Sequence, residues 1–261
     1  MWDDPDLLKV FVGLPEEKMD CAQHVVRYLV PFTTLQKQGL IDKPVIGTFG
    51  EISAHPGSHS IIRKADIFYN RAPGNGMMNR YAMEYRSHGG RVIVDLDDDF
   101  WLVDPLNPSY KVLGTEEVWA QKTEDGTKHK IWSDGEGGFD SARNRRHVDM
   151  VAFGLAQADL VTCTSERLRQ RLLSHNPAVE VIPNPVDLDT WIRPIERPGF
   201  RIGWCGGDSH AHDVKIVIPA LLEFLKRHED AKVVIAGALL PALKRIPEDR
   251  REFYEWVGME A

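Results

Sequence analysis

The stretch RIGWCGGDSHAHD, residues 201–213, decides the fold predicted for this chain. A short segment of strand character, 201–204, runs into Gly206 and Gly207, and the residues after them can open a helix. Glycine lets the backbone approach a ligand closely, and a helix start offers unpaired N–H groups and the positive end of the helix dipole. The pattern predicts a phosphate- or diphosphate-binding turn in a nucleotide-binding α/β domain.

Strand-like and helix-like segments alternate through the rest of the chain, which predicts a parallel sheet covered on both faces. The expected strands are residues 7–12, 45–49, 65–70, 91–95, 160–164 and 179–182, with 201–204 and 232–237 in a second sheet. The expected helices are residues 21–39, interrupted at Pro31, and 77–88, 141–157 and 165–173. The predicted fold class is therefore α/β, with two Rossmann-like domains.

The predicted domains are residues 1–195, a Rossmann-like domain, and residues 196–261, a partial second Rossmann-like domain. The proline-rich stretch Pro194–Pro198 is the expected linker. Residues 104–140 do not fit the strand–helix alternation and are predicted to be an insertion containing a β-hairpin with its turn at residues 124–126.

Composition sets the broad class. The 261 residues carry a formal net charge of −7, which argues against a general nucleic-acid binder. The 3 cysteines lie far apart and match no disulfide framework or zinc spacing, so a reducing compartment is expected. The acidic start has no signal-peptide pattern, and no apolar run is long enough to span a membrane. We expect a soluble, cytoplasmic protein.

Two further motifs narrow the family. ADLVTCTSE at 158–166 resembles an A-D-x-V-x-x-x-S strand and helix start, and VIPNPVD at 181–187 resembles a V-I-P-N-G-V-D segment, with Pro185 in place of the glycine. Together with residues 203–213, they make the chain similar to the GT-B glycosyltransferases, in particular the large nucleotide-sugar-dependent family 4.

This resemblance implies a GT-B-like fold in which the N-terminal domain holds the acceptor and the C-terminal domain holds the nucleotide sugar. The nucleotide sugar is a co-substrate, and neither a cofactor nor a metal ion is expected. Transfer would retain the anomeric configuration and rest on positioning and on stabilising the departing diphosphate. The acceptor stays open among a glycan, a lipid, a protein and a modified nucleic acid.

On the acceptor side, the carboxylates that follow the strand at 91–95 are the main candidates. Several like charges at one strand end need a compensating group, and Arg71 at the neighbouring strand end is the expected partner. The resemblance assigns the catalytic contacts to Asp97 and Asp98, and places Arg71 and Asn184 on the acceptor side. The alternative is a solvated acidic loop that caps Trp101 and its helix.

On the donor side, Gly206, Gly207, Ser209, His210 and Lys215 are the candidate diphosphate-binding residues. Lys215 falls about where the family places its diphosphate-binding lysine, and a lysine serves phosphate as a point charge. The alternative is a plain strand-to-helix turn with an exposed lysine.

Glu252 and Glu260 have the seven-residue separation of the family's donor-site glutamates, but they follow only the second strand of the second domain, and we treat the spacing as chance. The sheet of that domain is expected to leave Val233, Ile235 and Leu239–Leu240 without partners. Weak or undetectable nucleotide-sugar binding by this truncated chain and self-association through the unfinished sheet would follow.

Two other functions stay open. One is a catalytically silent binding or structural protein with a glycosyltransferase-like fold. The other is a different nucleotide-dependent α/β enzyme, which is disfavoured because a simple Rossmann dehydrogenase has its glycine loop after the first strand.

Overall fold

The computed structural model describes residue 4 and residues 6–15, 25–54, 60, 62–119, 130–185 and 199–255. The chain divides into two compact units, residues 1–102 with 142–191 and residues 103–141 with 192–261. The predicted boundary at 195 and the predicted linker Pro194–Pro198 lie outside the described residues.

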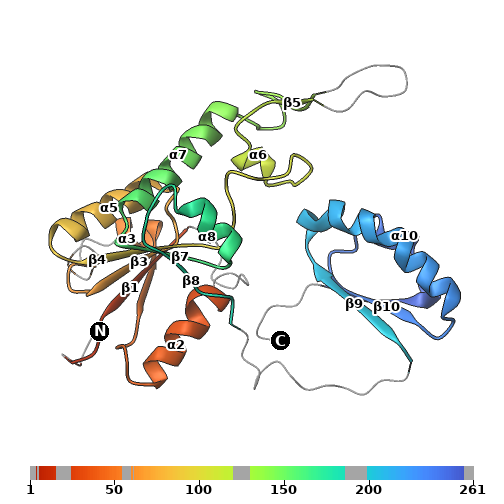
Figure 1. The fold of residues 1–261 in the computed structure, drawn as a ribbon, viewed down its shortest axis with the longest axis horizontal. Coiled ribbons are helices and arrows are strands. Elements are labelled where there is room, and N and C mark those ends of the chain that lie inside the picture. The colour runs from red at the N-terminus through yellow and green to blue at the C-terminus, as the bar shows by residue number, and fades with distance from the viewer. Residues whose placement is uncertain are drawn as a thin grey trace. The chain divides into compact units, whose positions relative to one another are not determined.

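The first unit is built on six parallel strands in the order β2-β1-β3-β4-β7-β8 (Figure 1). Their bounds are Val10–Leu14 for β1, Val45–Thr48 for β2, Ile67–Asn70 for β3, Arg91–Leu96 for β4, Leu160–Cys163 for β7 and Val179–Val181 for β8. The predicted α/β class with a parallel, Rossmann-like sheet is confirmed. The order reverses between β1 and β3, which makes this a doubly wound sheet with a topological switch point there.

The register places the ends of the central strands at one edge of this sheet. Gly13 of β1 lies opposite Asn70 of β3, and Asn70 lies opposite Val94 of β4. Leu96 of β4 lies opposite Cys163 of β7. Side chains that directly follow these strands therefore gather at the carboxyl edge, where open α/β sheets bind ligands.

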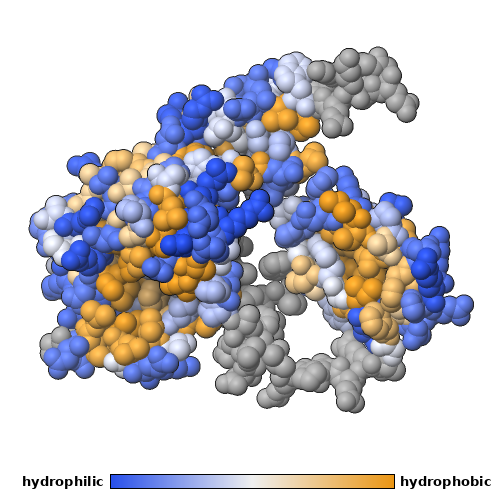
Figure 2. All heavy atoms as spheres, viewed as in Figure 1, coloured by the Kyte–Doolittle hydropathy of each residue, from blue (hydrophilic) through white to orange (hydrophobic). Residues whose placement is uncertain are grey.

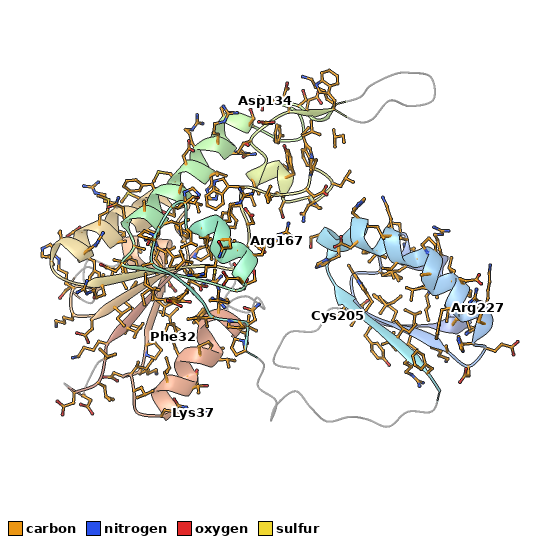
Figure 3. All side chains as sticks on the ribbon, viewed as in Figure 1. Phe32, Lys37, Asp134, Arg167, Cys205 and Arg227 are labelled. Carbon is orange, nitrogen blue, oxygen red and sulfur yellow. The ribbon has the colours of Figure 1, made fainter. Side chains whose placement is uncertain are left out.

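Helices cover both faces of the sheet. Among the described residues, the α-helices of this unit are α2 (Val30–Lys37), α3 (Phe49–Ala54), α5 (Gly76–Ser87), α7 (Ser141–Gln157) and α8 (Glu166–Leu172). On one face, α5, α7 and α8 bury their apolar side chains against Phe68, Val92 and Val94. On the other face, Phe32 of α2 meets Tyr69 edge-on, with ring centroids 5.0 Å apart (Figure 3).

The helix predicted over residues 21–39 is two pieces in its described part, which begins at residue 25. A π-helical segment, η1 (Val25–Leu29), runs directly into α2, and Pro31 lies in the first turn of α2. Proline is tolerated there because the first N–H groups of a helix have no intrahelical partner. The interruption expected at Pro31 is therefore a change of helix type.

Helix α5 shows how closely local signals set an element. The side chain of Asn75 accepts hydrogen bonds from the N–H groups of Met77 and Met78, which caps the start. The helix ends before Gly89, whose φ of +88° is a left-handed conformation that glycine adopts without strain. The predicted helix 77–88 differs from α5 by one residue at each end.

In the second unit, residues 103–119 and 130–141 form a small structure around stacked aromatic rings. It contains α6 (Tyr110–Leu113) and the antiparallel pair β5 (Val118–Trp119) and β6 (Lys130–Trp132). Tyr110 stacks on Phe139 with centroids 6.1 Å apart, and Trp132 donates a 2.6 Å hydrogen bond to the carbonyl of Pro105. The hairpin turn predicted at 124–126 lies outside the described residues.

Residues 199–255 of the same unit form a second parallel sheet in the order β11-β10-β9. The strands are β9 (Arg201–Gly206), β10 (Lys232–Gly237) and β11 (Arg251–Tyr254), and the helix α10 (Ala211–Arg227) follows β9 through the short turn η2 (Asp208–His210). Two further 3-10 turns, η3 (Leu243–Arg245) and η4 (Glu248–Arg250), precede β11, a strand that sequence reasoning missed.

The prediction that Val233, Ile235 and Leu240 lack apolar partners is wrong. These side chains are buried against Val214 and Ile218 of α10 and against the segment that holds η3, because the chain after β10 folds back over the same face of the sheet. Leu239 is partly buried against the same cluster. Part of the surface of this region is apolar (Figure 2). Its exposed large hydrophobic residues are Phe200, Ile216, Val217, Phe253 and Tyr254.

Within the described ranges, no helix combines the length and the apolar character that crossing a membrane requires.

Candidate functional site

The carboxyl edge of the first sheet holds a group of four charged side chains, Arg27, Arg71, Asp95 and Asp97, which we call the arginine–aspartate cluster. Arg27 comes from η1, Arg71 follows β3, Asp95 lies in β4, and Asp97 follows β4. The cluster lies beside the switch point between β1 and β3, where ligands bind in folds of this class.

Asp95 is the centre of the cluster and its side chain is fully buried. Its Oδ2 accepts a 3.1 Å hydrogen bond from Nε of Arg27, and its Oδ1 accepts a second bond from Nη2 of the same guanidinium. Thr162 of β7 donates a third bond of 2.6 Å to Oδ1. A buried carboxylate is tolerated when it is paired and hydrogen-bonded in this way.

Arg71 links Asp95 to Asp97. Its Nε lies 3.3 Å from Oδ2 of Asp95, and its Nη2 donates a 3.1 Å hydrogen bond to Oδ1 of Asp97. The Arg71 side chain is 5% exposed and that of Asp97 is 15% exposed, so Asp97 is the acid of the cluster that reaches solvent. Within the acidic run after β4, Arg71 thus pairs with Asp97, and the roles predicted for both residues in binding the acceptor stay predictions.

Arg27 is the member of the cluster that sequence reasoning missed. It lies inside the apolar run VVRYL at 25–29 and is 3% exposed. Burial lowers the pKa of its guanidinium. The hydrogen bond to Asp95 and the charge of Asp95 together raise that pKa by more than burial lowers it, so the net shift is upward. The signal in the sequence was a single arginine within an otherwise apolar helical segment, because such a residue needs a buried acid.

Asn184 joins the same cluster through Arg27. Nη1 of Arg27 donates a 3.3 Å hydrogen bond to Oδ1 of Asn184 and a second, short bond to the carbonyl of Ile182. The structure therefore brings Arg71, Asp97 and Asn184, three of the predicted acceptor-side residues, to one place.

Asp98, the other predicted catalytic residue, is exposed beside the cluster. The following acid, Asp99, is tied down: its Oδ2 lies 3.2 Å from Nε of Arg171, and its Oδ1 accepts a bond from the N–H of Trp101. Trp101 stacks on His175 with ring centroids 4.6 Å apart. Asp99 thus caps Trp101, but Trp101 lies in a turn and not in the helix that the alternative interpretation expected, while Asp97 belongs to the cluster.

His147 of α7 is a second residue that sequence reasoning did not select. Its ring packs against Gly74, where an added Cβ would lie 2.2 Å from Cε1 of the imidazole, and stacks on Phe100, which follows the acidic run. Burial lowers the pKa of His147, and a hydrogen bond with the backbone of Gly74 partly opposes that shift. The net shift of the His147 pKa therefore favours the neutral imidazole, close to Gly74 and Phe100.

The second predicted site is the turn between β9 and α10. Gly206 ends β9, and an added Cβ there would lie 3.0 Å from the Trp204 ring and 3.1 Å from the His210 ring. At Gly207 an added Cβ would meet nothing within 4 Å, so the backbone of this residue is open to approach. His210 is the N-cap residue of α10, and its side chain makes no capping hydrogen bond.

Ser209, His210 and Lys215 are all exposed around this turn. Nδ1 of His210 lies 3.1 Å from Oδ2 of Asp213, one turn into the helix. Lys215 occupies the first half of α10, close to the N-terminal end of the helix dipole. The five predicted donor-side residues therefore belong to one strand–turn–helix unit, and their role in binding phosphate stays a prediction.

Across the described residues, no group of three or more His, Cys, Asp or Glu side chains is arranged to hold a metal ion. Glu252, whose spacing to Glu260 was treated as chance, lies on β11 with its Oε1 3.3 Å from Nη2 of Arg201. Glu260 lies outside the described residues.

Comparisons with known proteins were made for sequence and for structure. No protein-family model matches the chain, and no curated protein matches its sequence. Forty solved chains match it in structure. One is an S. aureus MnaA-UDP co-structure, which is 12% identical and covers 96% of this chain and 69% of its own, with a TM-score of 0.47. Because that score is low, we describe the fold from the two parallel sheets alone.

Proposed function

We propose that this chain is a nucleotide-sugar-dependent glycosyltransferase that moves a sugar from a nucleoside-diphosphate donor to an acceptor. The observation that supports it best is the turn from β9 through Gly206 and Gly207 into α10, at the carboxyl end of a parallel sheet. The same chain already contains a doubly wound unit with its own polar edge. Two such sheets in one chain suit two substrates, one on each.

The donor side rests on backbone groups and on the helix dipole. Gly207 leaves its backbone open, and the first N–H groups of α10 are not capped by the side chain of His210. A diphosphate placed there would gain hydrogen bonds and the favourable end of the dipole. Lys215 would add one positive charge, which stabilises the diphosphate as its bond to the sugar breaks.

The acceptor side rests on Asp97. Arg71 holds one of its carboxylate oxygens, and the side chain is partly exposed, so it can accept a hydrogen bond from a sugar or acceptor hydroxyl. The exposed Asp98 follows it in the chain, and Asn184 belongs to the same cluster through Arg27, so both can add polar contacts. Catalysis would come from orienting the hydroxyl and stabilising the leaving diphosphate, and it requires no protein nucleophile.

Saturation-transfer NMR with UDP-, GDP- and ADP-sugars tests the donor side, because it detects weak binding. We expect at least one donor to bind the wild-type chain and Gly207→Val to abolish the signal. Gly203→Val is the matched control, because an added Cβ at Gly203, in the middle of β9, also meets nothing within 4 Å. Absence of binding by the wild-type chain, or equal loss in both variants, would contradict the proposal.

A catalytically silent binding protein is the second candidate, and one observation favours it. Three acids in and after β4 are engaged by arginines: Asp95 by Arg27 and Arg71, Asp97 by Arg71, and Asp99 by Arg171. A transferase should slowly hydrolyse its donor with water as the acceptor, and Asp97→Asn should lower that rate. A silent protein would bind the donor and leave it intact.

A further inference from the structure

We propose that Arg27 is the positioning residue of the acceptor side, which holds Arg71 and Asn184 in place for substrate without touching substrate itself. The assignment of an acceptor side rests on the proposed function, but the positioning itself rests on contacts within the first unit. Arg27 makes four hydrogen bonds to three partners, Asp95, Ile182 and Asn184.

These partners lie far from Arg27 in the chain. Asp95 is 68 residues away, and Ile182 and Asn184 are 155 and 157 residues away. One guanidinium therefore ties η1 to the end of β4 and to the segment that follows β8. The planar fork of arginine suits this task because its donors have a fixed relative geometry.

The first branch of this contact set reaches Asp97 through two intermediates. Arg27 binds both carboxylate oxygens of Asp95, which fixes the plane of that carboxylate. Asp95 then lies 3.3 Å from Nε of Arg71, while Nη2 of Arg71 binds Asp97. Without Arg27, Arg71 would be the remaining arginine beside Asp95, and it would turn toward Asp95 and away from Asp97.

The second branch reaches Asn184 directly. Nη1 of Arg27 holds the backbone carbonyl of Ile182 and the side-chain oxygen of Asn184 at the same time. The side-chain oxygen of Asn184 is thereby held by Arg27. Arg71, through Asp95, and Asn184, directly, thus take their orientation from one buried arginine, Arg27.

A lysine at position 27 distinguishes the branch through Asp95 from the branch to Asn184. Arg27→Lys keeps a positive charge for Asp95, but a single ammonium cannot reproduce the fork that also reaches Ile182 and Asn184. Arg27→Gln removes the charge as well and affects both branches. The double variant R27M/D95N removes both charges together, so it does not leave Asp95 buried and unpaired.

The experiment uses the full 261-residue chain, and its first readout is the side-chain N–H signals of Asn184 and Arg71 in ¹H–¹⁵N NMR. We expect R27K to shift the Asn184 amide and leave the Arg71 Nε signal in place, and R27Q to shift both. Arg63→Gln is the control, because Arg63 forms an exposed ion pair with Glu84 on another part of the unit; it should move neither signal.

The second readout is donor binding, measured with the same UDP-, GDP- and ADP-sugars. We expect R27K to leave donor binding unchanged, because the contacts of Arg27 lie within the first unit. A variant that loses its fold would lose donor binding as well. If R27Q does not fold, R27K and R27M/D95N decide the question.

An unchanged Asn184 signal in R27K overturns the proposal, and so does an unchanged Arg71 Nε signal in R27Q. These results differ from failure of the proposed function, in which the wild-type chain neither binds nor hydrolyses any nucleotide sugar. In that case the NMR comparison still decides whether Arg27 positions Arg71 and Asn184.

Discussion

The two parallel sheets of this chain each hold a carboxylate between two cationic side chains, in very different surroundings. In the first unit, Asp95 lies between Arg27 and Arg71 with a fully buried side chain. In the second, Glu252 lies 3.3 Å from Arg201 and 3.8 Å from Lys232, with 21% of its side chain exposed. Asp95 also accepts a hydrogen bond from Thr162.

This difference separates a charge group that organises a site from one that lies on a sheet surface. Burial makes each partner of Asp95 dependent on the others, because a buried charge that loses its partner cannot be stabilised by water. Solvent can replace much of what Arg201 and Lys232 do for Glu252. The first sheet therefore presents a preformed polar edge, whereas the second presents an open glycine turn with exposed side chains.

The largest expected effect comes from removing the two carboxylates in turn. Asp95→Ala leaves Arg27 buried without its acid and takes from Arg71 one of its two acids, Asp97 being the other, and it should lower the free energy of unfolding of the first unit by about 3–5 kcal/mol. Glu252→Ala should cost the second unit about 1 kcal/mol or less. Urea unfolding, followed by hydrogen exchange of amides in β4 and β10, measures each unit separately. Equal losses in the two units would remove the distinction drawn between the two carboxylates.

A smaller effect is expected from adding one methyl group to each sheet. Gly13→Ala places a Cβ 2.2 Å from Cε of Met78 and 2.7 Å from Cε2 of Phe68. The Met78 side chain can yield but the packed Phe68 ring cannot, so we expect a loss of about 1–3 kcal/mol. Gly203→Ala in β9 meets nothing within 4 Å, and its effect should stay within about 0.5 kcal/mol. Thermal unfolding would contradict this if Gly203→Ala were the more destabilising change.

The smallest effect concerns pH and His147. Burial lowers the pKa of His147 in the folded chain, so the unfolded chain binds a proton first as the pH falls. The stability associated with the neutral imidazole is present above the ordinary histidine pKa of about 6.5 and decreases as the pH falls below it. His147→Gln should flatten the stability of the first unit between about pH 7 and 5, as followed by urea midpoints. His212→Gln, at an exposed position of α10, is the control, and an equal change in both variants would show that His147 is not responsible.

Local signals were enough to predict most elements of both sheets. Gly89 and Gly90 end the predicted helix 77–88, and Ser165 caps α8 by accepting a bond from the N–H of Leu168. Short, mainly apolar runs such as 91–95 predicted buried strands, because strands of a parallel sheet are covered on both faces and carry few polar residues. The short strand β11 was missed because REFY, residues 251–254, alternates weakly and follows a charged turn.

The candidate site was predictable only in part. Arg71 and Asp97 could be paired in advance, because the ends of neighbouring parallel strands meet at one edge of a sheet. The contacts of Arg27 could not be predicted, because its partners Asp95 and Ile182 lie 68 and 155 residues away. No spacing rule relates positions so far apart in the chain.

The sequence by itself determined the α/β class, the strand–helix alternation, the glycine turn after β9 and the acidic run after β4, since each depends on residues close together in the chain. Only the tertiary structure decided which acid is buried, which arginines hold it, and that Val233 and Ile235 are covered by α10. The physical reason is that burial and pairing depend on which segments the fold brings together, and that is a property of the whole packed chain.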